Sequence, residues 1–394
     1  MISNVELQRK RIGLTQIELS QKAGISRRTL SSIERATSVP SVDIAIKLAT
    51  ILNSTVEDLF FFTDAEPKNT ALSVPPVQSI VHTPNKWDEF TFIDLFAGIG
   101  GIRLGFESIG GKCVFSSEFD DDACKTYEAN FGEHPSGDIT QIDAADIPDF
   151  DILLAGFPCQ AFSIIGKKEG FANETCGTLF FEIERILKEK KPKAFMLENV
   201  RNLVAHDKGK TFKVIKEHLE ALGYSVHAKV LNALDYGVPQ KRERIIIVGF
   251  LKKIPFEFPL PVEMSQRLTL TDILEDHVDE KYYVKENIRT SRLERLKDKA
   301  YPRPYISHEN MAGSVTPHPY SSALRAGASA NYILINDERR PTEREMLRIQ
   351  GFPDTFKIVL PYGKIKKQCG NSVAVPVIKA VATEMLRSLR TYDG

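Results

Sequence analysis

The sequence predicts a protein of the α/β class with a mostly parallel sheet, preceded by a small all-α unit. From Phe90 onward, short apolar runs alternate with amphipathic segments, which is the pattern of strands joined by helices. The first sixty residues instead carry apolar positions at helical spacing. A length of 394 residues and a hydrophobic content of 42% allow two or three folded units with substantial cores.

The composition limits the classes of function. The chain has 52 basic and 52 acidic residues, so its formal net charge of zero gives no general attraction to nucleic acid, and any role on DNA depends on local motifs. Its five cysteines are odd in number and never form a CxxC pair, which indicates a reducing cytosol and argues against a disulfide framework or a zinc site. No segment approaches the ~18 apolar residues of a membrane span, and the charged start is unlike a secretory leader. We therefore expect a cytoplasmic protein that binds neither membrane nor metal.

Capping residues divide residues 1–63 into about five short helices. Thr15 and Glu18 have the spacing of a capping box, Gly24 ends that helix, and Ser26 can cap the next. The first unit is therefore expected to be a compact helical bundle.

Residues 14–53 of this bundle resemble the helix-turn-helix domain of the phage-repressor type. A helix, an Ala-Gly turn, a second helix and the later Pro40 occur in the register of that family. The resemblance implies that the helix Arg27–Arg35 enters a major groove, with three side chains against base edges and one against a phosphate. These are Arg27, Arg28 and Ser32, and Gln16, respectively. The alternative is a small bundle whose arginines form only a solvated surface.

Residues 64–87 are predicted to be a linker. They contain four prolines, no sustained periodicity and no aromatic residue before Trp87. We therefore expect the units on either side to fold largely independently.

The large domain is expected to contain six strands with helices between them. The strands are predicted at Thr91–Phe96, Cys113–Glu118, Ile152–Ala155, Ala194–Glu198, Ser225–Leu231 and Arg244–Phe250. The helices are predicted at Ile102–Ser108, Ala123–Asn130, Leu179–Glu189 and Lys210–Leu222. Open sheets of this kind bind ligands at the carboxyl ends of their strands, so side chains at those ends are the candidates for a site.

A glycine-rich turn follows the first predicted strand of this domain. Gly98, Gly100 and Gly101 precede a helix and allow a ligand to approach the backbone closely. Glu118 ends the second strand, 20 residues after Gly98, where a carboxylate can accept hydrogen bonds from a ribose. A tight structural turn explains the glycines equally well.

Cys159 follows the third strand at the same edge. The next strand brings Glu198 and Asn199 to that edge, and a later strand begins with Arg242 and Arg244 nearby. A thiol, a carboxyl group and two guanidinium groups would thus face one crevice, which favours a nucleophilic cysteine. The alternative for Cys159 is a buried filler residue, and structural ion pairing explains Glu198 with an arginine but leaves the thiol unexplained.

Six stretches match, in order, the motifs of the cytosine-C5 DNA methyltransferases of bacterial restriction-modification systems. They are FIDLFAGIGGIRLGF, FPCQAFS, ENV, LDYGVPQKRERIIIVGF, REMLRIQGFPD and QCGNSVAVPV. The sequence departs from the family pattern at Phe119, where a tryptophan is common, in an extra residue within 162–177, and in the segment between the two motif blocks.

The resemblance implies a Rossmann-like sheet of the S-adenosylmethionine-dependent methyltransferases with a smaller target-recognition domain. Residues 88–255 and 337–394 would form the catalytic domain, and residues 256–336 the target-recognition domain. Within the latter, residues 281–303 contain eight Lys or Arg against three acids, a net of +5, which suits the phosphate backbone of DNA.

The resemblance also implies roles for single residues. Cys159 would add to carbon 6 of a flipped cytosine, Glu198 would hold or protonate ring N3, and Arg244, with Arg242, would support that carboxylate and the cytosine O2. S-adenosylmethionine would be the cofactor. Its predicted binding residues are Phe96, Gly98, Gly101, Glu118, Asp138, Ile139, Pro158, Asn371, Ser372 and Val373. Gln160 and Ser163 are expected to contact DNA.

We therefore interpret the chain as a DNA cytosine-C5 methyltransferase that protects a short site from a cognate restriction enzyme. Its N-terminal domain is expected to repress its own operon, by binding an operator, with dimerisation on that DNA as a further expectation. Two alternatives remain open: a DNA-binding regulator with a degenerate catalytic domain, and an RNA cytosine-C5 methyltransferase.

Overall fold

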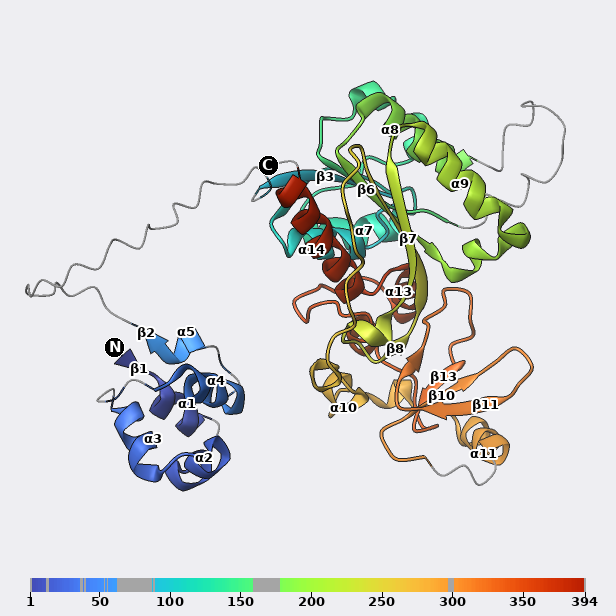
Figure 1. Cartoon of the computed structure of the whole chain (residues 1–394). Helices are drawn as coiled ribbons and strands as arrows, with labels where there is room; N and C mark the ends of the chain where they lie inside the picture. The colour runs from blue at the N-terminus through green and yellow to red at the C-terminus, as the bar shows by residue number, and fades with distance from the viewer. Residues whose placement is uncertain are drawn as a thin grey trace, which may run out of the picture. The chain divides into compact units, whose positions relative to one another are not determined.

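The chain forms two compact units, residues 1–81 and 82–394, in the computed structural model (Figure 1). The residues that the structure describes are 2–11, 14–35, 38, 40–52, 54, 56–61, 87, 89–158, 178–296 and 301–392. Apart from Trp87, the predicted linker 64–87 lies outside these residues. Among the described helices, none is long and apolar enough to cross a lipid bilayer.

The first unit contains the helices that capping residues predicted. They are α1 (Val5–Arg11), α2 (Gln16–Ala23), α3 (Arg27–Glu34), α4 (Val42–Ile51) and α5 (Val56–Leu59). The capping box of Thr15 and Glu18 is present, Gly24 ends α2 in the left-handed conformation, and the Ser26 side chain accepts a hydrogen bond from the Thr29 N–H. These helices bury a core that includes Leu19, Leu30, Ile33 and Leu48. A two-residue strand pair, β1 (Ile2–Ser3) with β2 (Phe60–Phe61), joins the ends of the unit and was not predicted.

A six-stranded sheet forms the centre of the second unit. Its strands are β3 (Phe90–Leu95), β4 (Gly111–Ser117), β5 (Ile152–Gly156), β6 (Ala194–Val200), β7 (Ser225–Asn232) and β9 (Glu243–Phe250). The order is β4-β3-β5-β6-β9-β7, and β9 is antiparallel to both of its neighbours. The predicted α/β class is confirmed. Because β9 runs antiparallel to β6, the start of β9 lies at the same edge as the carboxyl ends of the parallel strands.

Helices cover both faces of this sheet. The helices are α6 (Gly101–Glu107), α7 (Asp121–Phe131), α8 (Thr178–Lys190), α9 (Lys210–Ala221) and α14 (Val375–Tyr392). Strand side chains alternate between two cores: Ile152 and Leu154 pack in the core with α6 and α14, whereas Leu153 and Ala155 pack in the core with α8 and α9. Figure 1 shows α8 and α9 on one side of the strands and α14 on the other.

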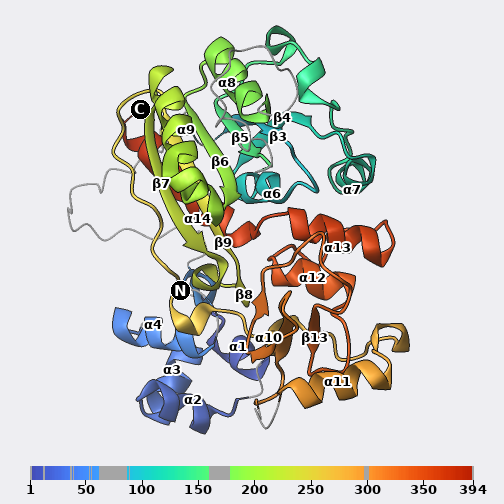
Figure 2. The same cartoon turned by 90° about the vertical axis from the view of Figure 1, so that its right-hand side faces the viewer.

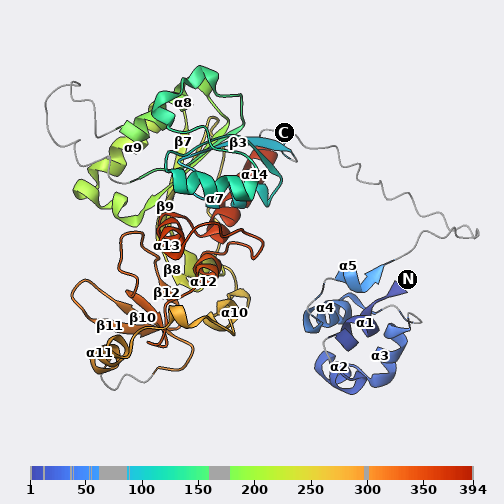
Figure 3. The same cartoon turned by 180° about the vertical axis from the view of Figure 1, so that it is seen from behind.

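A smaller sheet and several short helices lie beyond the carboxyl edge. The sheet has the order β11-β10-β13, with β10 at Ile306–Glu309, β11 at Val315–His318 and β13 at Ile333–Ile335. Its neighbours are α10 (Leu270–Ile273) and α11 (Glu286–Leu296). Figure 2 shows α12 (Glu343–Ile349) and α13 (Tyr362–Asn371) between the large sheet and this smaller part. A parallel pair, β8 (Gln240–Lys241) with β12 (Ser321–Ser322), joins the two parts (Figure 3).

Candidate functional site

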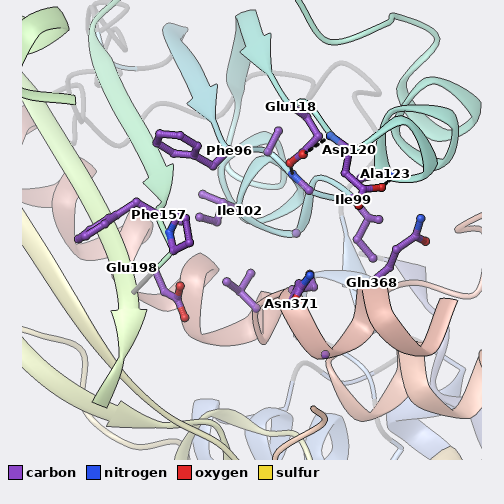
Figure 4. A pocket seen from close by; sticks show the side chains of 18 of the residues that line it. Phe96, Ile99, Ile102, Glu118, Asp120, Ala123, Phe157, Glu198, Gln368 and Asn371 are labelled. Carbon is purple, nitrogen blue, oxygen red and sulfur yellow. Dashed lines mark hydrogen bonds between the residues drawn. The ribbon is translucent and has the colours of Figure 1, made fainter. Parts of the chain in front are cut away.

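A cavity of about 720 Å³ opens at the carboxyl edge of the large sheet. The ends of β3, β4, β5 and β6, the start of β9, and α13 with the loop after it all contribute side chains to its lining. Figure 4 shows Glu118 and Glu198 at different ends of this one space. Eleven of the predicted site residues line it: Phe96, Gly98, Gly101, Glu118, Pro158, Glu198, Arg242, Arg244, Asn371, Ser372 and Val373.

The three glycines after β3 have different environments. Gly98 has a φ of +56°, and a Cβ at this position meets no atom within 4 Å, so its backbone faces open space in the cavity. Gly101 instead allows close packing, because a Cβ there comes within 2.7 Å of Ser372 Oγ. At Gly100 a Cβ would lie 2.2 Å from the Phe131 ring. Only Gly98 of the three therefore fits the predicted close approach of a ligand to the backbone.

Glu118 is buried beside this turn. Its Oε2 accepts a hydrogen bond of 2.8 Å from the Gly98 N–H, and its Oε1 accepts from the N–H groups of Phe119 and Asp120 at 2.9 and 2.8 Å. These bonds fix the orientation of the carboxylate at the end of β4. Since a carboxylate has about four lone-pair sites, one remains for a ligand hydroxyl. The open backbone at Gly98 and this oriented acceptor fit the ribose and adenine side of a nucleoside cofactor.

Glu198 and Arg244 form an ion pair at the other end of the cavity. Glu198 lies near the end of β6, Arg244 lies near the start of β9, and Arg244 Nε lies 3.0 Å from Glu198 Oε1. Burial raises the pKa of Glu198, while the nearby charges of Arg244 and Arg242 and the Arg244 hydrogen bond oppose that rise. The result is a carboxyl group that is held in one orientation and takes up a proton more readily than an exposed glutamate does.

Arg242 has other partners than the carboxylate that we expected it to support. Its guanidinium donates to the backbone carbonyl of Leu324 at 3.0 Å, to that of Gly370 at 3.1 Å, and to that of Ser372. Burial lowers the pKa of Arg242 to about 9. Its charge still faces Glu198, but its hydrogen bonds join the cavity wall to the smaller sheet region.

Helix α13 adds residues to the cavity that no motif in the sequence indicated. Lys364 Nζ lies 2.5 Å from Asp122 Oδ2, and Lys367 Nζ lies 2.6 Å from Asp120 Oδ2. Gln368 donates to the carbonyl of Asp122 at 2.8 Å. These contacts join α13 to the start of α7, more than 200 residues earlier in the chain, and no local spacing signals them.

Asn199 also has a role that its motif alone did not define. Its Nδ2 donates to the carbonyl of Phe157 at 2.9 Å, and its Oδ1 accepts from the N–H of Val200. The end of β6 is thereby tied to the backbone directly before Pro158.

Cys159, Gln160 and Ser163 lie outside the described residues.

Two of the predicted cofactor residues do not line the cavity. Asp138 is exposed and its carboxylate accepts a hydrogen bond from the Thr140 N–H, while Ile139 is 2% exposed and packs in the core with α8. Their expected contact with an adenine stays a prediction.

The basic stretch 281–303 is less available to DNA than its net charge suggests. Arg292 is buried and pairs with Glu309, which also pairs with Arg295. Arg303 is 2.8 Å from Glu338. Three arginines of this stretch are therefore paired with carboxylates of the protein itself, and one of them, Arg292, is also buried.

In the first unit, α3 presents Arg27 and Arg28 as exposed side chains, and Ser32 donates to the Arg28 carbonyl. Gln16 differs from the expectation of a free phosphate contact. Its Nε2 donates to Glu34 Oε2 at 2.6 Å, and its Oε1 lies 3.4 Å from Arg27 Nε. Contacts of these four residues with DNA stay predictions.

Comparison with known proteins matches both parts of the chain. Residues 90–387 match the family model of the C-5 cytosine-specific DNA methylases, and residues 5–59 match a helix-turn-helix model. The type II methyltransferase M.HaeII of Haemophilus aegyptius is 58% identical over 301 residues, which cover 76% of this chain and 94% of that protein. M.SsoII of Shigella sonnei, also a type II methyltransferase, is 41% identical over 404 residues, 98% of each chain.

Solved structures agree with the fold of the second unit. A mutant of DNMT2 from Spodoptera frugiperda superposes with a TM-score of 0.59 at 21% identity, covering 76% of this chain and 99% of that one.

Proposed function

This chain belongs to the C-5 cytosine-specific DNA methylase family and is a DNA (cytosine-5-)-methyltransferase, and we propose that it methylates a flipped cytosine in a short duplex site, with S-adenosylmethionine as donor. We further propose that this methylation protects the site from a cognate restriction enzyme. The observation that carries the proposal is the single cavity with Glu118 and Gly98 at one end and the Glu198–Arg244 pair at the other. One space thus has room for a cofactor and a base side by side, and its volume is typical of small-molecule sites.

The cofactor end is supported by residues of four elements. Gly98 leaves its backbone open, Glu118 presents an oriented acceptor for ribose hydroxyls, and Phe96 lines the wall for an adenine. Asn371 and Val373 close the space from α13 and the loop after it. S-adenosylmethionine bound here would supply a methyl group on a sulfonium, which is an electrophile.

At the base end, the Cys159 thiolate adds to carbon 6 of cytosine, and the electron pair of the 5,6 double bond shifts toward carbon 5. Glu198 holds or protonates ring N3, so that negative charge does not accumulate on the ring while the Sγ–C6 bond forms. Arg244 holds the carboxylate in position. After carbon 5 has gained its methyl group, a base removes the carbon-5 proton and the C5–H electron pair re-forms the 5,6 double bond, while the Sγ–C6 bond breaks and the Cys159 thiolate is regenerated.

Carbon 6 and ring N3 are inaccessible in a stacked duplex, so the cytosine has to leave the helix. Flipping costs a few kcal/mol, which contacts with the enzyme offset. The enclosed position of Glu198, which is 8% exposed, supports this step, because a base inside the double helix does not reach it.

The first unit is proposed to repress transcription of the protein's own operon. The exposed Arg27 and Arg28 on α3, at the start of the helix that the family places in the major groove, support this role. Operator binding should then depend on residues 1–63 and methyl transfer on residues 88–394.

A methyl-transfer assay tests the proposal. Purified intact protein and a Cys159→Ser variant are incubated with duplex DNA, or with RNA of the same sequence, and with S-adenosylmethionine carrying a radioactive methyl group. Incorporation into duplex DNA by the intact protein alone is expected. Incorporation into RNA only would support the RNA methyltransferase, and none in either nucleic acid, together with retained operator binding, would support a regulator without catalysis.

A further inference from the structure

The arginines of residues 256–336 differ in how their charges are neutralised. Five of the six form ion pairs with carboxylates: Arg267, Arg289, Arg292, Arg295 and Arg303. Arg325 is the sixth. Its side chain is exposed and forms no ion pair with any residue that the structure describes. It is therefore the arginine of this region whose charge is available to an external acceptor.

The Arg325 side chain is nevertheless held in one orientation. Its guanidinium carbon lies 4.9 Å from the centroid of the Tyr332 ring, and its NH2 lies 3.5 Å from His308 Nε2. The backbone N–H of Arg325 donates to the Tyr332 hydroxyl at 3.0 Å. Tyr332 is itself 4% exposed and belongs to the core of this region. Burial and the charge of Arg325 both lower the pKa of His308, which keeps that ring neutral and able to accept a hydrogen bond.

The segment 324–328 is fixed against the wall of the catalytic cavity. Arg242 lines that cavity and donates to the carbonyl of Leu324 at 3.0 Å. Gly370 packs so closely that a Cβ there would lie 2.1 Å from the backbone nitrogen of Ala326. Lys366 Nζ donates to the carbonyl of Ala328 from the same helix, α13. The exposed Arg325 therefore belongs to a segment that packs on Arg242 and Gly370, two residues that line the cavity that contains Glu198.

The Arg325 guanidinium has no carboxylate partner among the described residues and is held in one orientation by Tyr332 and His308. Such a group has a specific chemical preference. Its planar fork matches the O6 and N7 acceptors of guanine in the major groove, and an arginine that is already stacked on a tyrosine loses less side-chain entropy when such a pair forms. A phosphate contact would need only the positive charge. Resting on the proposed function, we propose that Arg325 reads a guanine in a base pair next to the target cytosine and so determines part of the recognition sequence.

The test compares Arg325→Lys and Arg325→Ala with the intact protein and with Arg303→Lys, whose charge is already paired with Glu338. Each protein is incubated with S-adenosylmethionine and a library of duplexes with randomised flanking bases, and bisulfite sequencing gives the base preference at every flanking position. Lysine keeps the charge but loses the fork. Both Arg325 variants should lose guanine discrimination at one position, by roughly 5- to 150-fold, while Arg303→Lys keeps the intact profile.

Other outcomes overturn the proposal. An unchanged profile in Arg325→Lys, or a uniform loss of methylation in both variants without any change of base preference, would assign Arg325 to a phosphate contact or to packing on Tyr332. If a variant methylates too slowly for a profile, competition for binding between duplexes that differ at that base pair gives the same ratio. Absence of methylation by the intact protein would refute the proposed function itself, and this inference with it.

Discussion

Replacing Glu198 by Gln separates the two effects that we assign to its carboxyl group, because the change removes its ionisation and keeps its shape. Glu198 is 8% exposed, and its Oε1 lies 3.0 Å from Arg244 Nε. A Gln oxygen at this place still accepts that hydrogen bond. The rate of methyl transfer should fall by about 10²- to 10⁴-fold, the usual contribution of a positioned proton donor, which corresponds to ~3–5 kcal/mol of transition-state stabilisation.

The stability of the same variant should change in the opposite direction. Burial raises the pKa of Glu198 in the folded protein in spite of Arg244 and Arg242. The stability that this carboxyl group contributes is therefore fully present below its unfolded pKa of about 4.3, and is lost as the pH rises through the folded value. At pH 8 the ionised group destabilises the fold. Each tenfold difference in proton affinity between the folded and unfolded states is ~1.4 kcal/mol, or roughly 2 °C in melting temperature for a domain of this size.

Thermal melts of both proteins between pH 8 and pH 4, beside single-turnover methylation, measure both quantities. The variant should melt higher at pH 8, and the difference should shrink as the pH falls toward 4. A variant that melts lower at pH 8 would show that the Arg244 pair outweighs the cost of burial and that the ionised Glu198 stabilises the fold. A rate within tenfold of the intact protein would remove the role of Glu198 in proton transfer.

Three further changes test the contacts of Arg242, the cofactor site at Gly98 and the independence of the two units. Arg242→Met removes the donor to three backbone carbonyls and should cost about 3–5 kcal/mol, seen as a fall of roughly 5–8 °C in the melting temperature of the second unit. A change below ~2 °C would contradict its role in joining the cavity wall to the smaller sheet region. Gly98→Ala should cost about 1–2 kcal/mol of backbone strain and raise the Kd for S-adenosylmethionine at least ~10-fold, whereas Gly132→Ala, also at positive φ with open space around it, should show the strain alone. Equal Kd values in the two glycine variants would place the cofactor elsewhere. Removal of residues 1–86 should abolish operator binding in a mobility-shift assay and leave the methylation rate within about threefold, and loss of both together would show that the two activities are not separable.

Much of the fold follows from local patterns in the sequence. Short apolar runs such as Ile152–Gly156 and Ala194–Val200 are buried on both faces of the sheet, so they stand out from the polar segments around them. The edge that carries Glu118 and Glu198 then follows, because the carboxyl ends of parallel strands face the same way. Thr15, Gly24 and Ser26 likewise act through neighbours within a few residues.

The features that the sequence did not reveal all depend on distant contacts. Nothing local predicts that β9 lies between β6 and β7, or that β12 pairs with β8. The QKRER motif indicates Arg242 and Arg244 equally, and only the structure separates the ion pair of one from the backbone contacts of the other. The high charge of 281–303 also misled, since Arg292 and Arg295 find Glu309 only when α11 packs on the small sheet.

Methyl transfer through Cys159 can be measured by bisulfite sequencing of plasmid DNA from cells that express the intact protein, beside cells that express Cys159→Ser. We expect protected cytosines at one position of one short motif with the intact protein, and none with the variant. The same data would give the recognition sequence. Protection that is equal in both samples, or absent from both, would contradict methyl transfer through Cys159.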